Sequence, residues 1–372
     1  MKVSIVNPVW DARASTPAET LVRFRSLTGW AEAIRAAGVT DVDVFQRFDQ
    51  AASIDRGRVS YRFVTDGHQP RPPIWYRGAT LCAAVAAVSP DVVHVNGLDH
   101  PRLTRGLRRR LSPTAVIVVQ DHGGYDPTML SAWRKAWIRR GLRSADVLLV
   151  ATEEQRNVFI ASGLAPAALR VRDVMEASTS LRADGQSAPR DGLTLLFVGR
   201  LNRNKDPLTV LEGITRFLAH RPDARIMFVY DDNELESAIR SKLADDRALA
   251  SKVTLVGPVR HEDLPSIYAR ADLFVLGSHR EAMGFAALEA LACGVIPVLT
   301  DIPSFRVMTD GGRLGALWRP GDAGSLFDAL VGVTSLELQP QREGARAHFE
   351  RCLSWEAIGR RAVEIYRELS RT

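Results

Sequence analysis

Cysteine is scarce in this chain of 372 residues, which holds only Cys82, Cys293 and Cys352. The three are far apart in the sequence and lack metal-ligand spacing, which indicates a reduced cytosolic protein rather than a disulfide scaffold. No apolar run approaches the roughly 20 residues that a membrane-spanning helix needs. The start, MKVSIVNPVW, resembles a first β-strand rather than a secretion signal, because its apolar stretch is short and contains Pro8. We therefore expect a cytoplasmic protein.

The sequence also lacks internal repeats, low-complexity segments and a glycine-rich turn after its first strand. A nicotinamide-dependent oxidoreductase would need such a turn, and VNPVWDA supplies none. With 46% hydrophobic and 25% charged residues the chain is globular, and its length predicts two domains. Residues 1–190 hold 26 Lys and Arg against 18 Asp and Glu, whereas residues 191–372 hold 23 against 25. Only the first half would attract a polyanion or an anionic membrane surface.

Short apolar runs alternate with longer helical patterns along both halves of the chain. The strand candidates are MKVSIV, VDVFQ, DVVHV, AVIVVQ and ADVLLVA in the first half, and TLLFVG, ARIMFVY, KVTLVG, ADLFVL and VIPVLT in the second. Continuously apolar runs are typical of strands that are covered on both faces. With the intervening helices they predict an α/β protein with two doubly wound, parallel sheets. The polar stretch EASTSLRADGQSAPRDG between the halves has the composition of a linker.

Two stretches of the second half contain residues suited to a ligand site. In LFVGRLNRNKDP a strand is expected to end at Val198, so that Gly199, Arg200 and Lys205 follow at the carboxyl edge of the sheet, where such folds bind ligands. A glycine permits close approach of the backbone to a ligand, and an Arg with a Lys suits a diphosphate. Taken alone, both cations are equally well explained as surface charges beside a loop.

The second stretch, SHREAMGFAALEALACGVIPV, covers residues 278–298 and places Glu281 in a loop before a helix that starts near Gly284. Glu289 then lies in the first turns of that helix. Carboxylates accept hydrogen bonds from hydroxyls, so Glu289 suits a ribose and Glu281 a hexose, although a solvated acid near a helix start would explain either one alone. The unsatisfied N–H groups at the helix start form an anion site; they belong to Met283, Gly284, Phe285 and Ala286.

These stretches resemble a known family. ADLFVLGSHREAMGFAALEALACGVIPVLTDIP closely resembles the glutamate-x7-glutamate signature of the family-4 retaining glycosyltransferases with the GT-B fold, also called glycosyl transferase group 1. FVGRLNRNKDP resembles their Arg/Lys diphosphate clamp, and DVVHVNG, QDHGG and SWEAIGRRAVEIYREL also fit. The resemblance covers nearly the whole chain and is most specific from about residue 193 to 305.

The resemblance implies two Rossmann-like domains whose parallel sheets face a central cleft. The implied parts are an acceptor-binding domain (1–180), a linker (181–192), a nucleotide-sugar-binding domain (193–350) and a C-terminal helix packing back towards the N-terminal domain (351–372). Within the second domain Arg200 and Lys205 would hold the donor diphosphate, together with Gly199 and the amides of 283–286. Glu281 would contact the donor sugar and Glu289 the ribose. Gly257, in LVGPV, would lie near the nucleotide base.

In the first half, His122 in QDHGGYDP matches the family histidine that lies near the reactive carbon of the donor, and Gly123–Gly124 beside it support that match. With Glu281, Arg200 and Lys205 it completes the implied catalytic set, although a lone histidine is more often structural. Weaker candidates for acceptor contacts are Asp121, Asp126, Asn96 and Arg13. His94 also ends a strand, and Asn96 stands where many relatives have a second histidine.

Three segments depart from the family pattern. The first loop, NPVWDARASTPAETLVR, lacks the usual glycine pair, so Arg13, Ser15 or Thr16 would have to substitute for it. VMEASTS at 174–180 replaces a Pro-Asn-Gly turn. Ala282 replaces the first glycine of the loop before the helix.

Two basic segments, RLTRGLRRRLS at 102–112 and SAWRKAWIRRGLRS at 131–144, have two interpretations. Trp133 and Trp137 among the cations resemble a helix attracted to anionic lipid at the inner face of the membrane. A core-facing helix with a solvated basic face explains the same pattern. Nucleic acid is not indicated, because no stacking platform or reading motif accompanies the charge.

The residues and the resemblance together predict a retaining glycosyltransferase of the hexosyltransferase kind. It would move a sugar from a nucleotide-diphosphate donor to a hydroxyl of a glycan, a lipid-linked sugar or a small molecule, without a cofactor or a metal. Two alternatives remain open: a sugar phosphorylase or epimerase of the same fold, and a non-catalytic relic that binds a nucleotide sugar.

Overall fold

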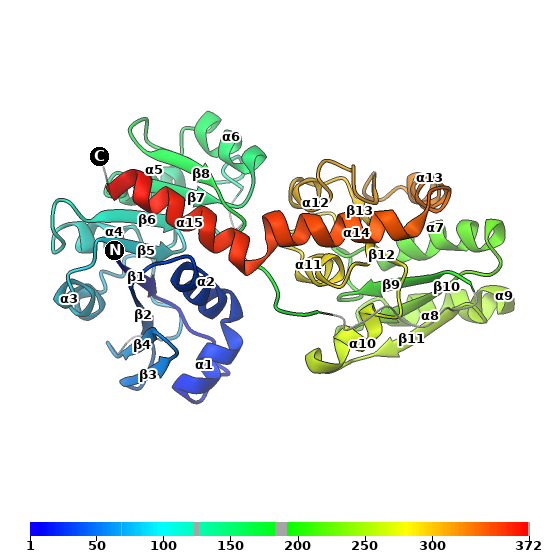
Figure 1. Ribbon diagram of the computed structural model, residues 1–372, viewed down its shortest axis with the longest axis horizontal. Coiled ribbons are helices and arrows are strands. Elements are labelled where there is room, and N and C mark those ends of the chain that lie inside the picture. The colour runs from blue at the N-terminus through cyan, green and yellow to red at the C-terminus, as the bar shows by residue number, and fades with distance from the viewer. Residues whose placement is uncertain (68, 123–125, 183–191, 371–372) are drawn as a thin grey trace. The chain divides into compact units, whose positions relative to one another are not determined.

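The computed structural model of the chain describes residues 1–67, 69–122, 126–182 and 192–370 and divides into two compact units (Figure 1). The first unit consists of Met1–Ala177 and Trp355–Thr372, and the second of Ser178–Ser354. Most of the predicted linker and the glycine pair at 123 and 124 lie outside the described residues. Among the described residues, no helix is both long enough and apolar enough to cross a membrane.

The first unit contains an eight-stranded sheet in the order β3-β4-β2-β1-β5-β6-β7-β8. Its elements are β1 (Lys2–Asn7), α1 (Pro17–Arg23), α2 (Arg25–Ala36), β2 (Asp41–Arg47), β3 (Ala52–Arg56), β4 (Val59–Val64), α3 (Ala79–Ala87), β5 (Val92–Asn96), α4 (Pro101–Arg108), β6 (Val116–Gln120), α5 (Ala132–Leu142), β7 (Val147–Val150), α6 (Glu153–Ala161), β8 (Arg170–Asp173) and α15 (Trp355–Ser370). Every pairing is parallel except that of β3 with β4. β6 and β7 are buried along their whole length, as expected for strands covered on both faces.

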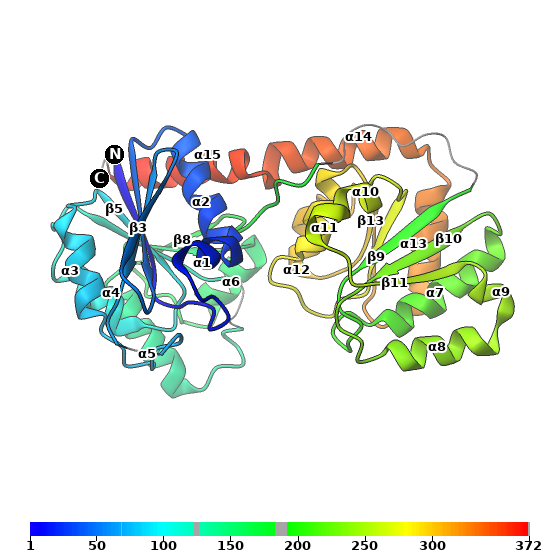
Figure 2. The same cartoon turned by 90° about the horizontal axis from the view of Figure 1, so that it is seen from below.

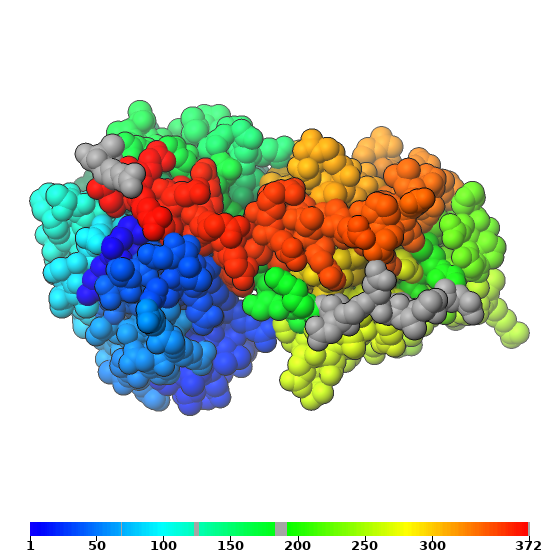
Figure 3. Space-filling model, in the orientation of Figure 1, coloured from blue at the N-terminus to red at the C-terminus, as the bar shows by residue number. Residues whose placement is uncertain are grey.

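Helices cover both faces of this sheet. One face packs its apolar side chains against α3, α4 and α5 in a single core, and α2 and α15 lie together on the other face (Figure 2). The two helices pack so closely that the contact requires glycine at position 359. A Cβ there would lie 2.4 Å from the backbone oxygen of Ala33. Trp30 donates to the hydroxyl of Tyr366 at 3.2 Å. α15 can be followed beside α2 on the surface seen in Figure 3.

The second unit contains a six-stranded parallel sheet in the order β11-β10-β9-β12-β13-β14. Its elements are β9 (Thr194–Val198), α7 (Pro207–His220), β10 (Arg225–Val229), α8 (Glu236–Asp245), α9 (Arg247–Ala250), β11 (Val253–Gly257), the 3-10 turn η1 (His261–Asp263), α10 (Leu264–Tyr268), β12 (Leu273–Leu276), α11 (Phe285–Ala292), β13 (Ile296–Thr300), α12 (Pro303–Met308), β14 (Ala316–Trp318), α13 (Ala323–Thr334), α14 (Leu338–His348) and the π-helical turn η2 (Phe349–Leu353). Both units are thus doubly wound α/β sheets, which confirms the predicted fold class. The loops after β9 and β12, two neighbouring strands, emerge at the same carboxyl edge.

All ten predicted strands are present, and the described residues contain four further strands that were not predicted. β3 and β4 form an antiparallel hairpin at the edge of the first sheet, closed by Gly57 at a φ of +60°. β4 alternates between buried and more exposed residues, so it lacks the continuous apolar run that identified the central strands. β8 and β14 are also edge strands and have only four and three residues.

Candidate functional site

The loop after β9 places Arg200 and Lys205 at the carboxyl edge of the second sheet. Gly199 donates its N–H to Val229 at 3.0 Å and so continues the ladder by one residue. A Cβ at Gly199 would meet its nearest neighbours at 3.6 Å, so packing within the chain does not require glycine there. Arg200 is exposed and has no hydrogen bond or ion pair with any described residue. Its guanidinium is therefore available to a ligand.

Lys205 and Glu281, 76 positions apart in sequence, form an ion pair. Each side chain is only 12% exposed. Lys205 is the second cation of the predicted diphosphate clamp, and Glu281 is the first acid of the glutamate signature. The two predicted motifs are therefore in direct contact. Removing either side chain would leave a poorly solvated charge, which is costly.

Hydrogen bonds to the backbone hold the loops that carry this ion pair against each other. His279 donates its N–H to the carbonyl of Asn204 at 2.8 Å, and the Asn204 side chain donates to the carbonyl of Arg280 at 3.0 Å. A side chain at Gly277 would lie 2.9 Å from the carbonyl oxygen of Lys205, so this close approach requires glycine. These contacts set the spacing of the cation and the acid independently of the ion pair itself.

Asp206, directly after Lys205, has a strained backbone conformation and fixes the loop through its side chain. Its φ of +45° lies in the left-handed region, which is uncommon for a residue with a side chain. Its carboxylate accepts from Thr209 N–H at 3.3 Å, which caps α7, and lies 3.1 Å from Nε2 of His279. Both contacts help to offset the strain.

The helix α11 begins at the predicted position. Its N-cap, Gly284, has a φ of +58° and no side chain to cap the helix. A Cβ at Gly284 would lie 2.6 Å from the ring of Phe305, so both backbone conformation and packing demand glycine. None of the N–H groups from Met283 to Ala286 has a hydrogen-bond acceptor among the described residues. Such donors at a helix start bind anions.

Glu289 lies inside the unit and not in solvent. Its Oε2 accepts from the hydroxyl of Tyr268 at 3.0 Å, and its Oε1 lies 3.0 Å from Nε2 of His261. Burial, and next the charge of Glu289, raise the pKa of Tyr268 well above its usual value, so the phenol remains a donor. Neither partner was predicted from the sequence. In the sequence, Tyr268 is marked only by its place on the buried side of a short helix, and His261 only by its place shortly after LVGPV.

Gly257, expected near a nucleotide base, ends β11 with a φ of +79°. A Cβ there would have no neighbour within 4 Å. The backbone at this position is therefore open on the side that a side chain would occupy.

In the first unit, His122 follows β6 and pairs with a residue that was not predicted from the sequence. Its Nδ1 lies 2.5 Å from Oε2 of Glu176, in the segment 174–180 that departs from the family pattern. Burial lowers the pKa of His122, but contact with Glu176, its charge and that of Asp121 outweigh burial and raise the pKa above the usual value.

The weaker candidates of the first unit differ in their surroundings. Asp121 is buried and accepts from Gln155 at 2.5 Å. Asp126 accepts from both the N–H and the hydroxyl of Thr128, in a local turn. Asn96 is the last residue of β5 and is half-buried.

His94 is a core residue. It lies between Tyr366 Oη at 2.5 Å and Gln120 Oε1 at 2.9 Å, and it is fully buried. Burial, and next the charge of His122, lower the pKa of His94 to about 3, so it is neutral at any physiological pH. Its role is to connect α15 to the centre of the sheet.

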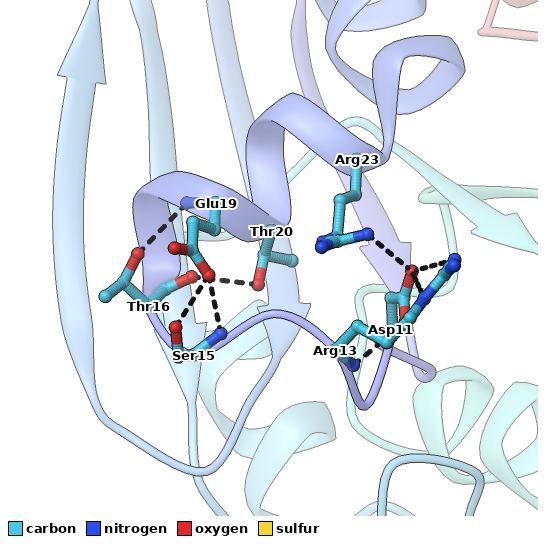
Figure 4. Close-up of polar contacts among 7 residues, drawn as sticks. All are labelled: Asp11, Arg13, Ser15, Thr16, Glu19, Thr20 and Arg23. Carbon is cyan, nitrogen blue, oxygen red and sulfur yellow. Dashed lines mark hydrogen bonds and ion pairs between the residues drawn. The ribbon is translucent and has the colours of Figure 1, made fainter. Parts of the chain in front are cut away.

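The first loop has its own internal contacts (Figure 4). Arg13 forms a bidentate ion pair with Asp11, and Arg23 reaches the same carboxylate at 3.5 Å. Thr16 caps α1 by accepting from the N–H of Glu19 at 3.1 Å. The carboxylate of Glu19 in turn accepts from the backbone and the hydroxyl of Ser15, at 2.7 and 2.8 Å. The groups expected to replace the glycine pair are thus engaged within the loop.

The basic segments form α4 and α5, which pack on the core through buried residues such as Leu107 and Ile138. Trp133 is nevertheless 60% exposed and stacks on Trp137, with ring centroids 6.3 Å apart. The pKa of Arg105 is lowered, mainly by partial burial and secondly by the charges of neighbouring arginines from both basic segments. The outer surface of these helices therefore concentrates positive charge around an exposed aromatic ring. We call it the basic patch; its residues are Arg102, Arg105, Arg109, Trp133, Trp137 and Arg140.

Comparison with known proteins identifies relatives for both units. The profile of the family described as glycosyl transferases group 1 matches residues 182–347, and that of glycosyltransferase family 4 matches residues 25–172. The GDP-mannose:cellobiosyl-diphosphopolyprenol alpha-mannosyltransferase of Xanthomonas campestris is 31% identical over 310 residues, 79% of each chain.

Solved structures agree in fold. A glycosyltransferase from Rickettsia africae superposes with a TM-score of 0.71 at 16% identity, covering 99% of this chain and 98% of that one. The Anabaena protein HepE in complex with UDP superposes with a TM-score of 0.66 at 16% identity, covering 99% of this chain and all of that one.

Proposed function

Since the chain belongs to the group 1, family 4 glycosyltransferases and has their GT-B fold, we propose that it transfers a sugar from a nucleotide-diphosphate donor to an acceptor hydroxyl with retention of configuration. The observation that carries this proposal is the ion pair of Lys205 and Glu281, which joins the loop after β9, where Arg200 also lies, to the loop that leads into the uncapped start of α11.

The leaving group is a nucleoside diphosphate, and its developing negative charge is the main demand on the protein. Arg200 and Lys205 supply two cations, and the amides at the start of α11 supply preorganised dipoles. Glu281, held beside Lys205, accepts hydrogen bonds from the hydroxyls of the transferred sugar. Glu289 accepts from the ribose while Tyr268 and His261 fix its orientation. Gly257 leaves room for the base.

In the transfer step the bond from the anomeric carbon to the phosphate oxygen breaks, and a bond from that carbon to the acceptor oxygen forms on the same face. The proton of the acceptor hydroxyl passes to the leaving phosphate oxygen, so that no side chain has to act as a general base. His122 and Glu281 orient the reacting groups. No metal or cofactor takes part, and the reaction therefore proceeds in the presence of a chelator.

The Xanthomonas relative indicates the first substrates to test. Its donor is GDP-mannose, and its acceptor is a cellobiosyl unit on a diphosphopolyprenol. We assign the acceptor to the first unit and take a sugar linked to a polyprenyl diphosphate as its class. The basic patch suits the anionic surface in which such a lipid resides, so we propose peripheral binding to the inner face of the membrane.

The direct test combines purified protein, GDP-mannose and UDP-glucose as alternative donors, and a polyprenyl-diphosphate saccharide, with a chelator present. Proton NMR of the product reports the anomeric configuration. Retention predicts an α-linked product from an α-linked donor, and Glu281→Gln abolishes it, whereas Glu212→Gln on the outer face of α7 does not. A β-linked product would refute retention. A need for inorganic phosphate, or conversion of the donor without an acceptor, would indicate a phosphorylase or an epimerase instead.

A further inference from the structure

His122 and Glu176 come from separate loops at the same edge of the first sheet. His122 follows β6 and Glu176 follows β8, and these strands lie on either side of β7. All three strands run parallel, so their carboxyl ends meet at one edge, where ligands of such sheets bind. The position of the pair is therefore one where a substrate contact is expected.

The burial of the two side chains is unequal. The Glu176 side chain is 6% exposed and that of His122 is 38% exposed, with Nδ1 and Oε2 2.5 Å apart. With a charged ring this contact is an ion pair that places the Nδ1 proton beside the carboxylate, and Nε2 is the ring nitrogen that remains for a substrate. A buried acid that fixes one nitrogen of a more exposed histidine is the arrangement by which proteins set the tautomer and orientation of a working imidazole.

Among the described residues, the charges that act on the ring belong to Glu176 and Asp121, both in the first unit. Glu176 and Asp121 favour the imidazolium form, and His94 is neutral because of its burial. Asp121 is itself held by Gln155 from α6. The carboxylate of Glu176 is the charge in direct contact with the ring, so its removal should have a larger effect on His122 than any other single change.

We infer that Glu176 is a positioning residue for this enzyme. Its carboxylate holds His122 protonated at Nδ1 and so directs Nε2–H towards an oxygen of the substrate. The inference rests on the proposed function for the identity of the substrate, a sugar. The segment 174–180, which departs from the family pattern, thus supplies the partner of the histidine. Glu176 touches no reacting atom and acts through His122 alone.

The consequence for pH follows from the raised pKa of His122. In the unfolded chain this group has its ordinary pKa, 6.5, and in the folded protein a higher one. The stabilisation from the pair is therefore fully present below pH 6.5 and is lost as the pH rises through the folded-state pKa. Glu176→Gln keeps the shape of the side chain and removes the charge. The variant should be less thermostable than the wild type at about pH 6 and should approach it at about pH 9.

The test that needs no substrate is a histidine NMR titration. In protein labelled at histidine, His122→Asn identifies the signal of His122. Glu176→Gln should lower the measured pKa of His122 by about one unit or more, a tenfold rise in its proton dissociation constant. Glu176→Asp, which retains the charge on a shorter arm, should lower it less, and it serves as the test if the Gln variant does not fold. Glu368→Gln, at an exposed acid on α15, should leave it unchanged.

The kinetic test uses the same variants. With a donor and an acceptor that the wild type turns over, Glu176→Gln should lower kcat at about pH 8 by roughly tenfold, with the donor KM little changed. A pKa of His122 that is equal in the wild type and Glu176→Gln would overturn the inference, as would an unchanged pH profile of kcat. Failure of the wild type to transfer any sugar would instead refute the proposed function and leave the titration result standing.

Discussion

The ion pair of Lys205 and Glu281 links the two halves of the candidate donor site at the scale of single residues. Two hydrogen bonds between their loops, from His279 N–H to the Asn204 carbonyl and from the Asn204 side chain to the Arg280 carbonyl, keep the two side chains adjacent. In the proposed reaction each member has a separate partner, the diphosphate for the lysine and a sugar hydroxyl for the acid. The pair therefore contributes both to folding and to catalysis, and substitutions can separate these roles.

Lys205→Met should destabilise the protein by about 2 kcal/mol, because the carboxylate of Glu281 loses its partner at a poorly solvated position. Adding Glu281→Gln should recover most of that loss, since no charge is then unpaired. Neither variant should transfer sugar. Urea unfolding measures the stabilities, and additive losses in the double variant would contradict a direct interaction.

Tyr268→Phe should cost about 1 to 2 kcal/mol of stability and raise the donor KM, because Glu289 loses a hydrogen bond that orients it. Tyr61 is the matched control, since its buried hydroxyl has no hydrogen-bond partner among the described residues. Tyr61→Phe should therefore be neutral or slightly stabilising. Melting temperatures and donor KM values check both, and an equal cost in the two variants would show that the Glu289 contact contributes nothing.

At the scale of elements, the start of α11 is the feature on which the anion site depends. The left-handed conformation of Gly284 turns the chain into the helix, and the ring of Phe305 closes the space beside it. The sequence predicted a helix start near Gly284, with Glu281 in the loop before it, and the structure adds the steric reason for that glycine.

Gly284→Ala should destabilise the protein by about 1 to 3 kcal/mol, from the strained φ and the clash with Phe305, and should weaken donor binding. Gly332 is the matched control in a helix. It lies in α13, and a methyl group added there would have no atom within 4 Å, so Gly332→Ala should stabilise by about 0.5 to 1 kcal/mol. Thermal unfolding with and without donor distinguishes the two. Undisturbed donor binding in Gly284→Ala would contradict a role for the α11 amides.

The basic patch on α4 and α5 should bind vesicles that contain anionic phospholipid, with an affinity that falls as salt rises. Trp133→Ala and Arg140→Glu should each weaken this binding several-fold, whereas Arg216→Glu on α7 should not. Vesicle sedimentation measures it. If vesicle binding changed neither with salt nor with either substitution, the basic patch would not be a membrane-binding surface but an ordinary solvated helix face.

At the scale of the whole molecule, periodicity and composition were sufficient for the fold. Nine of the ten predicted strands lie inside the sheets, β11 forms an edge, and the order of the ten in the sequence predicts two parallel sheets. The hairpin of β3 and β4 was missed because its strands are polar on one side, β8 because its sequence RVRD is mostly charged, and β14 because it has only three residues.

The residues of the candidate site could be predicted only where several of them lie close together in one stretch of the sequence. Arg200, Lys205, Glu281 and the start of α11 lie within two such stretches. Glu176 as the partner of His122 was not predictable, because the contact joins loops 54 positions apart and nothing in VMEASTS marks the acid as buried. The roles assigned to these residues stay predictions until donor binding is measured.

The measurement that tests the central claim most directly is a thermal-shift panel of UDP-, GDP-, ADP- and TDP-sugars on the wild type and on Arg200→Ala. Arg200 has no partner among the described residues, so its removal should leave the unliganded melting temperature unchanged. At least one donor should raise the melting temperature of the wild type, because a ligand at about a hundredfold excess over its Kd stabilises by about 2.7 kcal/mol. The rise should shrink in Arg200→Ala, because the diphosphate loses one of its two cations. No rise from any donor, or an equal rise in both proteins, would contradict a diphosphate-sugar site at the carboxyl edge of the second sheet.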